Sequence, residues 1–576
     1  MPRGKKLPII LAMMALVLPV GWHAVPVHVL AQHAGGTPVH TQAPDARDPF
    51  ASLVARSQDR GAVAPGRRVS LILSLKDPTA ARLTADVNAM YDPNAATFGH
   101  FKTPAQLDAR YGPPASRVMR VLRILRGYGL SGQWRRGNNW LVVAGPARRV
   151  DAVFHVSVHA YVAPDGVRYE ASARDPTLPR SLQPDVDGVS RISSYFRPLA
   201  HAIRGSGLTP VDLLDAYDIT ALRKRGLTGA GETVVFIELE GYAQKDLDGF
   251  TQHFHLPPMH PQLKAGPRLP PEKGEAEMDL EVVHEIAPAA QLRVYTLDST
   301  STDADWLALQ DRMVRENPGA IFSESLGKCD RWVDPLHAHT QARIGAHIYE
   351  QAAAAGDAVF AATGDAAAFD CLEHGDLPRP PTVALGTDFP AAIPWVTAVG
   401  GTRLSVRQDN TWYGETVWEY PSATQGTGGG VSAYFKMPPW QRGPGVQNLC
   451  LNPHNMREIP DVSAVADPTS SPIVDVMGEL GPGNGTSESA PVWAGMMALI
   501  DQYLKTQGLH RVGSLNPALY YLAMTRQRYP PFHDVTVGTN LYYPATPGYD
   551  MASGLGTPDA WNLARDLAAY VREGHR

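Results

Sequence analysis

The spacing of hydrophobic residues changes along the chain and predicts two kinds of folded region. In residues 66–195, the run from Val69 to Leu75 alternates between apolar and polar or smaller side chains, as a half-buried strand does. Apolar residues from Val118 to Leu125 repeat at helical spacing, with Ser116 as the expected N-cap. Further short elements are expected at 140–143, 147–154, 156–160 and 167–171. We therefore predict an α+β module with an open, ferredoxin-like sheet.

After residue 208 the pattern changes to strands that alternate with helices. Near-continuous apolar runs predict buried strands at 233–239, 292–295, 320–322, 358–362 and 395–399, and a helix is expected at 344–355. This order predicts an α/β fold, a parallel sheet with helices on both faces. Functional residues of such sheets gather at the carboxyl ends of the strands, and Asp365 follows one such end.

The N-terminus has the pattern of a secretory signal peptide. Basic residues up to Lys6 precede an apolar run from Leu7 to Val20, and small residues follow near Ala31. A membrane anchor is the alternative, but the run is short for a bilayer span, which needs about 20 residues. We expect residues 1–34 to be removed and the mature protein to be secreted or periplasmic, with no stable membrane association.

Composition divides the rest of the chain and limits its partners. A polar segment at 35–65 and another at 196–208 are expected to be linkers around the 66–195 module, leaving 209–576 as the largest domain. The net charge of −5 argues against nucleic-acid partners. The three cysteines, Cys329, Cys371 and Cys450, allow one disulfide and one thiol. We favour pairing of the first two, although the sequence alone leaves the choice open.

A serine stands where a tight turn enters a helix. The segment Gly485 to Pro491 precedes an apolar helical run, so the hydroxyl of Ser487 is expected beside the N–H groups of the first helical turn. Nucleophilic catalysis by this serine would also need a base and a group that stabilises an oxyanion.

Carboxylates are the better candidates for that base. Glu275 and Asp279 are four residues apart, so a helix would place them on one face. Two carboxylates this close repel each other, which raises the pKa of one and lets the pair share a proton. Taken alone, this pattern is more typical of a solvated acidic helix face. His284 comes five residues after Asp279 and would face elsewhere, and the chain lacks the His-Gly-Thr-His sequence of subtilisin-like enzymes.

An ordered set of motifs makes the chain resemble the sedolisin family of serine-carboxyl peptidases over nearly its whole length. The matching motifs are Ala109 to Gly112, Thr209 to Leu213, Glu275-x-x-x-Asp279 with Ile286 to Pro288, Ser323 to Gly327, Gly364-Asp365, Val399 to Thr402, Gly428 to Ser432, Pro460 to Ala464 and Gly485 to Pro491. The resemblance implies a subtilisin-like catalytic domain at 209–576. It also implies an activation prodomain at 66–195, which inhibits the enzyme and assists its folding.

The resemblance also implies a role for each catalytic residue. Ser487 would attack the peptide carbonyl, Glu275 would take its proton, and Asp279 would orient Glu275. Asp365, when protonated, would donate to the oxyanion, so activity is expected in the acid range and should fade toward neutral pH. The chain departs from the family at Ala366 to Ala368, after the oxyanion residue, and at Glu488, where a small residue is more usual.

Two acidic turns near the C-terminus suggest a calcium site. Asp534 and Asp550 would supply side chains, and Val535, Thr546 and Gly548 would supply carbonyl oxygens. By spacing alone these would be turn-stabilising residues, and the single structural Ca²⁺ is implied by the resemblance.

We expect a secreted acid endopeptidase, a monomer that is made as an autoactivating proenzyme and acts on proteins or peptides. A tripeptidyl aminopeptidase of the same family and a non-catalytic binding protein with the same fold are the alternatives.

Overall fold

The computed structural model describes residues 48–164, 166–195, 207–264, 274–297, 301–334, 339–372, 384–446 and 450–574. The predicted signal peptide, and residues 196–206 of the linker predicted at 196–208, lie outside these ranges. Within them, no helix combines the length and the apolarity that a bilayer span requires.

A large, mostly parallel sheet organises residues 207–574. In the described part of the chain it has eight strands, and its main path is β16-β15-β13-β11-β8-β10-β9, with β21 paired to β15. The bounds are β8 Thr233–Glu238, β9 Gln262–Leu263, β10 Gln291–Thr296, β11 Ile321–Glu324, β13 Ala358–Ala362, β15 Thr397–Val406, β16 Trp412–Val417 and β21 Val462–Val465. Only the pairing of β15 with β16 is antiparallel among them. The predicted parallel sheet is confirmed.

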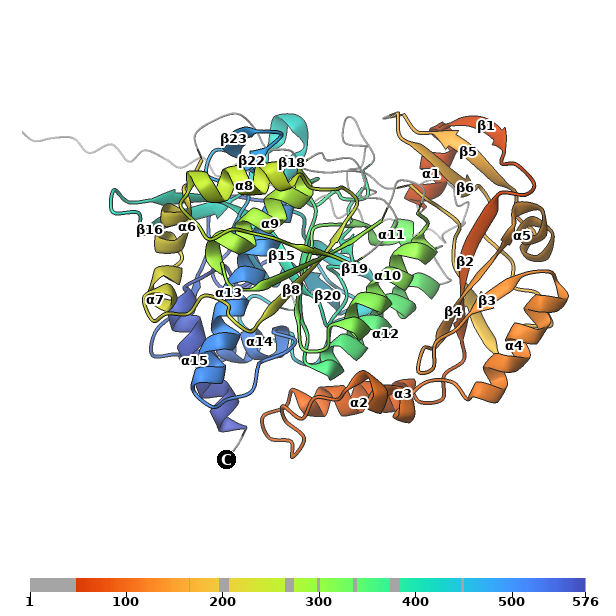
Figure 1. Ribbon diagram of the computed structural model, residues 1–576, viewed down its shortest axis with the longest axis horizontal. Helices are drawn as coiled ribbons and strands as arrows, with labels where there is room; N and C mark the ends of the chain where they lie inside the picture. The colour runs from red at the N-terminus through yellow and green to blue at the C-terminus, as the bar shows by residue number, and fades with distance from the viewer. Residues whose placement is uncertain are drawn as a thin grey trace, which may run out of the picture. The chain divides into compact units, whose positions relative to one another are not determined.

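Helices cover both faces of this sheet, because its strands are apolar on both sides (Figure 1). On β8, Val234 and Phe236 pack into a core with α9 (Glu275–Ile286) and α13 (Thr486–Thr506). Val235 and Ile237 face the opposite core, which includes α10 (Asp303–Glu316) and α12 (Thr340–Ala355).

Residues 48–195 form two smaller antiparallel sheets with helices, as the α+β prediction required. One sheet has the order β1-β5-β6 and the other β3-β4-β2-β7. The bounds are β1 Gln58–Ala62, β2 Arg68–Leu75, β3 Ser131–Gln133, β4 Trp140–Pro146, β5 Val158–Val162, β6 Arg168–Ser172, β7 Val186–Val189, α1 Pro49–Arg56, α2 Ala80–Met90, α3 Pro104–Arg110, α4 Ala115–Gly127 and α5 Ala147–Phe154.

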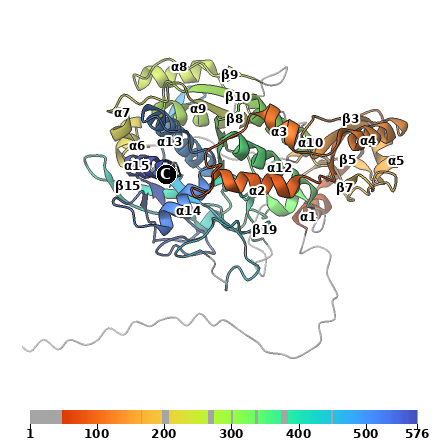
Figure 2. The same cartoon turned by 90° about the horizontal axis from the view of Figure 1, so that it is seen from below.

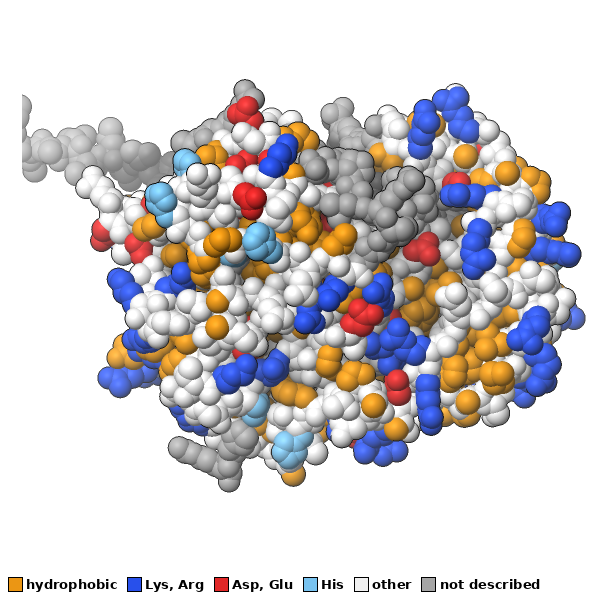
Figure 3. All heavy atoms as spheres, in the orientation of Figure 1, with side chains coloured by type: hydrophobic (Ala, Val, Ile, Leu, Met, Phe, Trp, Pro, Cys, Tyr) orange, Lys and Arg blue, Asp and Glu red, His pale blue; other side chains and the backbone are white. Residues whose placement is uncertain are grey.

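Helix α4 shows the expected division between buried and exposed faces. Its apolar residues Val118, Val121 and Leu125 are buried, while arginines occupy its outer side, where the space-filling view shows many basic side chains (Figure 3). The predicted cap is wrong, because the helix begins one residue before Ser116 and its N-cap is Pro114, which makes no side-chain cap bond.

The segment at 35–65, expected to be a linker, is partly folded. Helix α1 and strand β1 lie within it. Phe50, Leu53 and Val54 are buried at helical spacing, and the side chain of Asp48 caps the helix by accepting from the Ala51 N–H. The linker prediction was wrong here because it rested on the mostly polar composition of the whole segment, which contains only this short apolar stripe.

The first module packs against the outer side of α12. Helices α2 and α12 lie side by side when the molecule is viewed from below (Figure 2), and the two helices are in contact. The Tyr91 hydroxyl donates to the Ala353 carbonyl at 2.7 Å.

The remaining elements are shorter or lie around the sheet. They are α6 Pro210–Ala216, α7 Ile219–Arg223, α8 Gln244–His253, α11 Asp330–Val333, α14 Asn516–Met524, α15 Ala560–Glu573, β12 Lys328–Cys329, β14 Asp388–Phe389, β17 Glu419–Tyr420, β18 Gln425–Gly426, β19 Gly430–Lys436, β20 Met456–Ile459, β22 Ile473–Val476, β23 Glu479–Pro482, β24 Phe532–His533, β25 Thr557–Pro558 and the 3₁₀ turn Pro421–Ala423.

Candidate active site

Helix α13 presents Ser487 in its first turn. Gly485 precedes the helix with φ of 93°, a conformation that glycine adopts readily and other residues do not. Ser487 is buried, with 3% of its surface exposed. Pro491 lacks an N–H group, so the Ser487 carbonyl has no helical partner four residues later. The hydroxyl of Ser325, just after β11, donates to that carbonyl at 3.1 Å instead.

Helix α9 carries the two predicted carboxylates and is buried along its entire length. The solvated-face alternative is therefore wrong. Burial raises the pKa of Glu275 well above its ordinary value, and the neighbouring Asp279 raises it further, whereas the Ser487 hydroxyl lowers it. Neither Glu275 oxygen has a hydrogen-bond partner of normal geometry among the described residues, nor does Ser487 Oγ. The serine nonetheless lies close enough to influence the carboxyl.

Asp279 is held by Ser325, which the sequence analysis placed only in the family motif Ser323 to Gly327. Ser325 Oγ lies 2.9 Å from Asp279 Oδ1 and 2.7 Å from Oδ2. Because the same hydroxyl also lies next to the Ser487 carbonyl, Ser325 connects α9 to the serine helix. Burial raises the pKa of Asp279, although interactions with Ser325 and Glu238 lower it.

Two further carboxyl groups at the end of β8 border the pair and were not predicted. Glu238 is fully buried, and burial together with Asp279 and Glu275 raises its pKa. Glu240 accepts from the backbone N–H of Glu275 at 3.3 Å. Buried carboxyl groups this close share protons, so part of the cluster is neutral near pH 7. Their place at a strand's carboxyl end was the signal in the sequence.

Asp365 also borders Ser487. Its Oδ1 accepts from the Thr486 backbone N–H at 2.8 Å and from the Thr486 hydroxyl at 3.0 Å. A methyl group added to Gly485 would lie 2.6 Å from Asp365 Oδ2 and 3.2 Å from Ser487 Oγ. Both oxygens therefore border the same small space, which only glycine leaves open.

Glu488, the departure beside the serine, points away from solvent. It is fully buried, and burial raises its pKa well above the ordinary value. Burial also raises the pKa of Glu285 on α9, and the neighbouring Glu488 raises it further. Both are therefore neutral carboxylic acids over the acid range.

His284 is not brought to the serine. Its Nε2 lies 2.7 Å from the carbonyl oxygen of Pro257, and burial lowers its pKa. This agrees with the expectation that it faces elsewhere.

The predicted metal residues meet in two adjoining turns. The Gly548 N–H donates to Asp534 Oδ2 at 2.9 Å, and the Thr546 N–H donates to Asp550 Oδ2 at 2.8 Å. The Ser553 hydroxyl lies 3.2 Å from the Val535 carbonyl oxygen and 3.1 Å from Asp550 Oδ1. Burial raises the pKa of Asp550 to about 6 and also raises that of Asp534, with no cation among the described residues to oppose it.

The cysteines form the favoured pair, because Cys329 and Cys371 are joined by a disulfide. Cys450 is an exposed thiol outside this bond. Asp330 lies beside the two bonded sulfurs, which are not available as metal ligands.

Known proteins resemble this chain in sequence and in fold. The family described as "Pro-kumamolisin, activation domain" matches residues 55–195. Kumamolisin from Bacillus sp. (strain MN-32) is 31% identical over 554 residues, which cover 88% of this chain and 93% of that protein. Sedolisin from Pseudomonas sp. (strain 101) is 26% identical over 546 residues, 88% of each chain.

A mammalian protein and a solved structure extend the comparison. Tripeptidyl-peptidase 1 from Canis lupus familiaris is 26% identical over 88% of this chain and 93% of its own length. The structure of "Pseudomonas sedolisin (serine-carboxyl proteinase) complexed with two molecules of pseudo-iodotyrostatin" matches with a TM-score of 0.53 and 24% identity, over 65% of this chain and 99% of that one. At that identity the structure supports the fold alone. The match to kumamolisin shows that the chain belongs to the sedolisin family of serine-carboxyl peptidases. The match at residues 55–195 shows that it carries a pro-kumamolisin-type activation domain.

Proposed function

We propose that this protein is a secreted, acid-acting serine-carboxyl endopeptidase that is made as an autoactivating proenzyme. The observation that carries the proposal is the placement of Ser487, with Glu275 near its hydroxyl and Asp365 Oδ2 across the space beside Gly485. A nucleophile, a base and an oxyanion donor are thereby within reach of one peptide bond.

Glu275 activates the nucleophile. As Ser487 Oγ bonds to the peptide carbonyl carbon, its proton passes to Glu275, and the carbonyl π electrons move to the oxygen. Asp279 acts on Glu275 as its neighbouring carboxyl group and would orient it during the reaction, and Ser325 in turn holds Asp279. A high pKa suits Glu275 to this step, because it makes the carboxylate a stronger base.

Asp365 stabilises the oxyanion. Because Oδ1 already accepts two hydrogen bonds from Thr486, Oδ2 is the oxygen that carries the proton and donates it toward the new negative charge. A carboxylate at this position would repel that charge, so the group works only when it is protonated.

Collapse of the intermediate returns the proton. The carbonyl re-forms, the C–N bond breaks, and Glu275 gives its proton to the departing amine, which leaves an acyl group on Ser487. Water then attacks that ester with Glu275 again as base, releasing the acid and restoring the serine. The cycle needs Glu275 ionised and Asp365 protonated at the same time, so activity falls at low pH, where Glu275 is protonated, and at high pH, where Asp365 is ionised.

The C-terminal turns suit a structural Ca²⁺. Asp534 and Asp550 have no cationic partner among the described residues. Carbonyl groups lie in the same hydrogen-bonded turns, and Ca²⁺ prefers oxygen ligands of these two kinds. Asp534 and Asp550 would bind through side chains, and Val535, Thr546 and Gly548 through carbonyls. The ion would tie these turns together and take no part in the chemistry.

A tripeptidyl peptidase is the second candidate function. The match to tripeptidyl-peptidase 1 from Canis lupus familiaris covers 93% of that protein, the same share as the match to kumamolisin. That activity needs one end of the cleft closed around a free amine. Digestion of a denatured protein would separate the two, because an endopeptidase gives internal fragments and a tripeptidyl peptidase gives successive tripeptides.

An acid shift followed by mass spectrometry tests the proposal. Purified precursor is held at about pH 4, in parallel with Ser487→Ala and with Ser405→Ala, which removes an exposed hydroxyl on β15 as a matched control. We expect the wild type and the control to lose the activation domain and then digest a denatured protein, while Ser487→Ala stays intact. Equal conversion of all three, or of none, would contradict the proposed chemistry.

A further inference from the structure

The two main folded regions of the chain carry opposite charges. Residues 48–195 contain 20 Lys and Arg against 12 Asp and Glu, a formal charge of +8. Residues 209–576 contain 26 against 44, a formal charge of −18. The net charge of −5 for the whole chain therefore hides a basic activation domain beside an acidic catalytic domain. A domain this basic attracts anionic partners that the catalytic domain repels.

Basic side chains gather on the outer end of the activation domain, over α4, α5 and β1, where acidic side chains are fewer (Figure 3). Six arginines on four elements of this domain are exposed and form no ion pair with a described residue. We call them the basic end, and they are Arg60 of β1, Arg168 of β6, Arg123 and Arg126 of α4, and Arg148 and Arg149 of α5.

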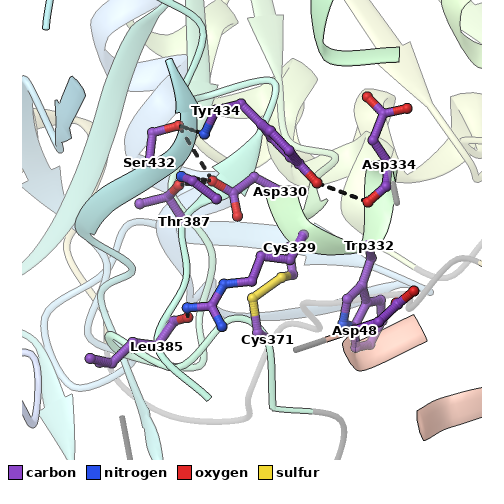
Figure 4. The surroundings of a disulfide bond; sticks show 12 residues. Asp48, Cys329, Asp330, Trp332, Asp334, Cys371, Leu385, Thr387, Ser432 and Tyr434 are labelled. Atoms are coloured by element: carbon purple, nitrogen blue, oxygen red, sulfur yellow. Dashed lines mark hydrogen bonds between the residues drawn. A yellow bond between two sulfur atoms is a disulfide. The ribbon is translucent and has the colours of Figure 1, made fainter. Parts of the chain in front are cut away.

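Most acidic side chains of the domain are engaged elsewhere. Asp48, which lies near Trp332 (Figure 4), pairs with Arg191 at 2.6 Å. Asp59, the neighbour of Arg60 in the sequence, lies 2.8 Å from Nδ1 of His159. Further pairs join Asp86 to Arg110, Asp185 to Arg120, and, across to the catalytic domain, Asp108 to Arg315 and Asp187 to Arg343. These carboxylates therefore do not neutralise the basic end.

A hollow of about 570 Å³ lies on the sheet β1-β5-β6, a size typical of sites for small molecules. Its lining includes Arg60, Arg67, Ala160, Val162, Arg168 and Glu170. Glu170 accepts from Arg67 Nε at 3.1 Å, so the carboxylate in the hollow is already paired. Arg60 and Arg168 remain, and planar guanidinium groups suit a phosphate, which each can bind through two N–H groups.

Helix α4 adds an apolar side chain to the basic end. Met119 is 54% exposed and lies on the same stripe of the helix as Arg123 and Arg126, four and seven residues later. Helices that lie on a lipid layer combine such side chains, because the apolar one enters the headgroup region while the arginines reach the phosphates. This combination favours a lipid surface over a water-soluble polyanion.

We propose that the activation domain binds a lipid surface with anionic headgroups, with the basic end against the lipid and a headgroup phosphate in the hollow between Arg60 and Arg168. This binding does not depend on the peptidase activity of Ser487. Where the precursor processes itself as proposed above, cleavage separates a basic domain that stays at the surface from an acidic enzyme that the surface repels. The activation domain then determines where the enzyme is released.

Vesicle co-sedimentation of the intact precursor tests the binding. The Ser487→Ala precursor, which prevents self-digestion, is mixed at about pH 7 with vesicles of phosphatidylcholine, alone or with about one-third phosphatidylglycerol. We expect binding to the anionic vesicles only, and weaker binding at high salt, because salt screens the attraction. Arg60→Gln with Arg168→Gln, and Arg123→Gln with Arg126→Gln, should each weaken binding about twentyfold, since one arginine near an anionic surface contributes about fivefold.

The matched control is Lys224→Gln with Arg442→Gln, which removes the same charge from exposed side chains of the catalytic domain. It should bind as its parent does. No binding to anionic vesicles, equal binding to neutral vesicles, or equal weakening by the control would each overturn the proposal. Binding to dextran sulfate but not to vesicles would overturn it as well, because the partner would then be a soluble polyanion.

Lysine variants test the phosphate site in the hollow. Vesicles with phosphatidic acid in place of phosphatidylglycerol present a phosphate monoester, and we expect the parent to bind them several times more tightly. Arg60→Lys with Arg168→Lys keeps the charge but loses the planar groups, so this preference should disappear. Arg123→Lys with Arg126→Lys should retain it. The same preference in both variants, or none in the parent, would refute the phosphate site.

Discussion

Glu324 at the end of β11 provides a quantitative test of the buried carboxyl groups. The side chain is 1% exposed, and burial raises its pKa to about 7 from an ordinary value of 4.5. Its Oε2 accepts from Gln310 Nε2 at 3.0 Å, and its Oε1 accepts from the Tyr349 hydroxyl at 2.5 Å. Folded protein therefore holds a proton on Glu324 at pH values where the unfolded chain has lost it.

The sign of the effect follows from this difference in protons bound. The stabilisation is fully present below pH 4.5 and is lost as the pH rises to about 7 and above. One pKa unit corresponds to about 1.4 kcal/mol, so the loss between pH 4 and pH 7 is about 3 kcal/mol. Glu324→Gln removes the titration. The Gln310 Oε1 has no partner among the described residues, so rotation of that amide can accept from the new NH₂ group.

The assay is denaturant unfolding in the Ser487→Ala background, which prevents self-digestion. Relative to its parent, Glu324→Gln should gain about 3 kcal/mol in free energy of unfolding between pH 4 and pH 7.5. Glu316→Gln is the matched control, because the ion pair with Arg312 and the Tyr295 hydroxyl lower the pKa of Glu316, so its loss does not favour the folded state at higher pH. Parallel pH dependences of Glu324→Gln and its parent would refute the reasoning.

Three further predictions address the site and its supports. Ser325→Ala removes the one hydroxyl hydrogen that Ser325 shares between the Asp279 oxygens and the Ser487 carbonyl, a contribution of about 0.5–1.5 kcal/mol, so kcat should fall about tenfold while the melting temperature changes little; an unchanged kcat would contradict the positioning role. Chelation with EGTA should lower the melting temperature of wild type by several degrees and leave Asp550→Asn unaffected; equal shifts would argue against calcium in these turns. Gly485→Ala places a methyl group 2.6 Å from Asp365 Oδ2, so activity should be lost in a protein that still folds; near-normal kcat/KM would show that the space beside Ser487 is not used.

Local patterns were enough to predict most of the scaffold. Strands β8 and β13 are apolar on both sides and were recognisable without partners, because a parallel strand is buried on both faces. Helix α1 was missed, because its three buried residues are a short apolar stripe within a polar segment, and their burial depends on contacts with Trp332 far along the chain.

The site depended more on long-range contacts. The composition of helix α9 is typical of a solvated helix face, because its burial comes from packing against α13. Only the resemblance to the family indicated that its carboxylates are catalytic. Ser325 was not identified as a positioning residue, because its partner Asp279 is 46 residues away in the sequence. Glu238 and Asp279 are likewise far apart in the sequence, and only the folding of β8 against α9 brings their carboxyl groups together.

The most direct test of the central claim is a crystal structure of the activated enzyme, at about pH 4, with a peptide aldehyde. The account predicts a hemiacetal bond from Ser487 Oγ to the aldehyde carbon, Glu275 within hydrogen-bond distance of Ser487 Oγ, and Asp365 Oδ2 about 2.7–3.1 Å from the hemiacetal oxygen. An aldehyde bound without a covalent bond to Ser487, or with its oxygen directed away from Asp365, would contradict it.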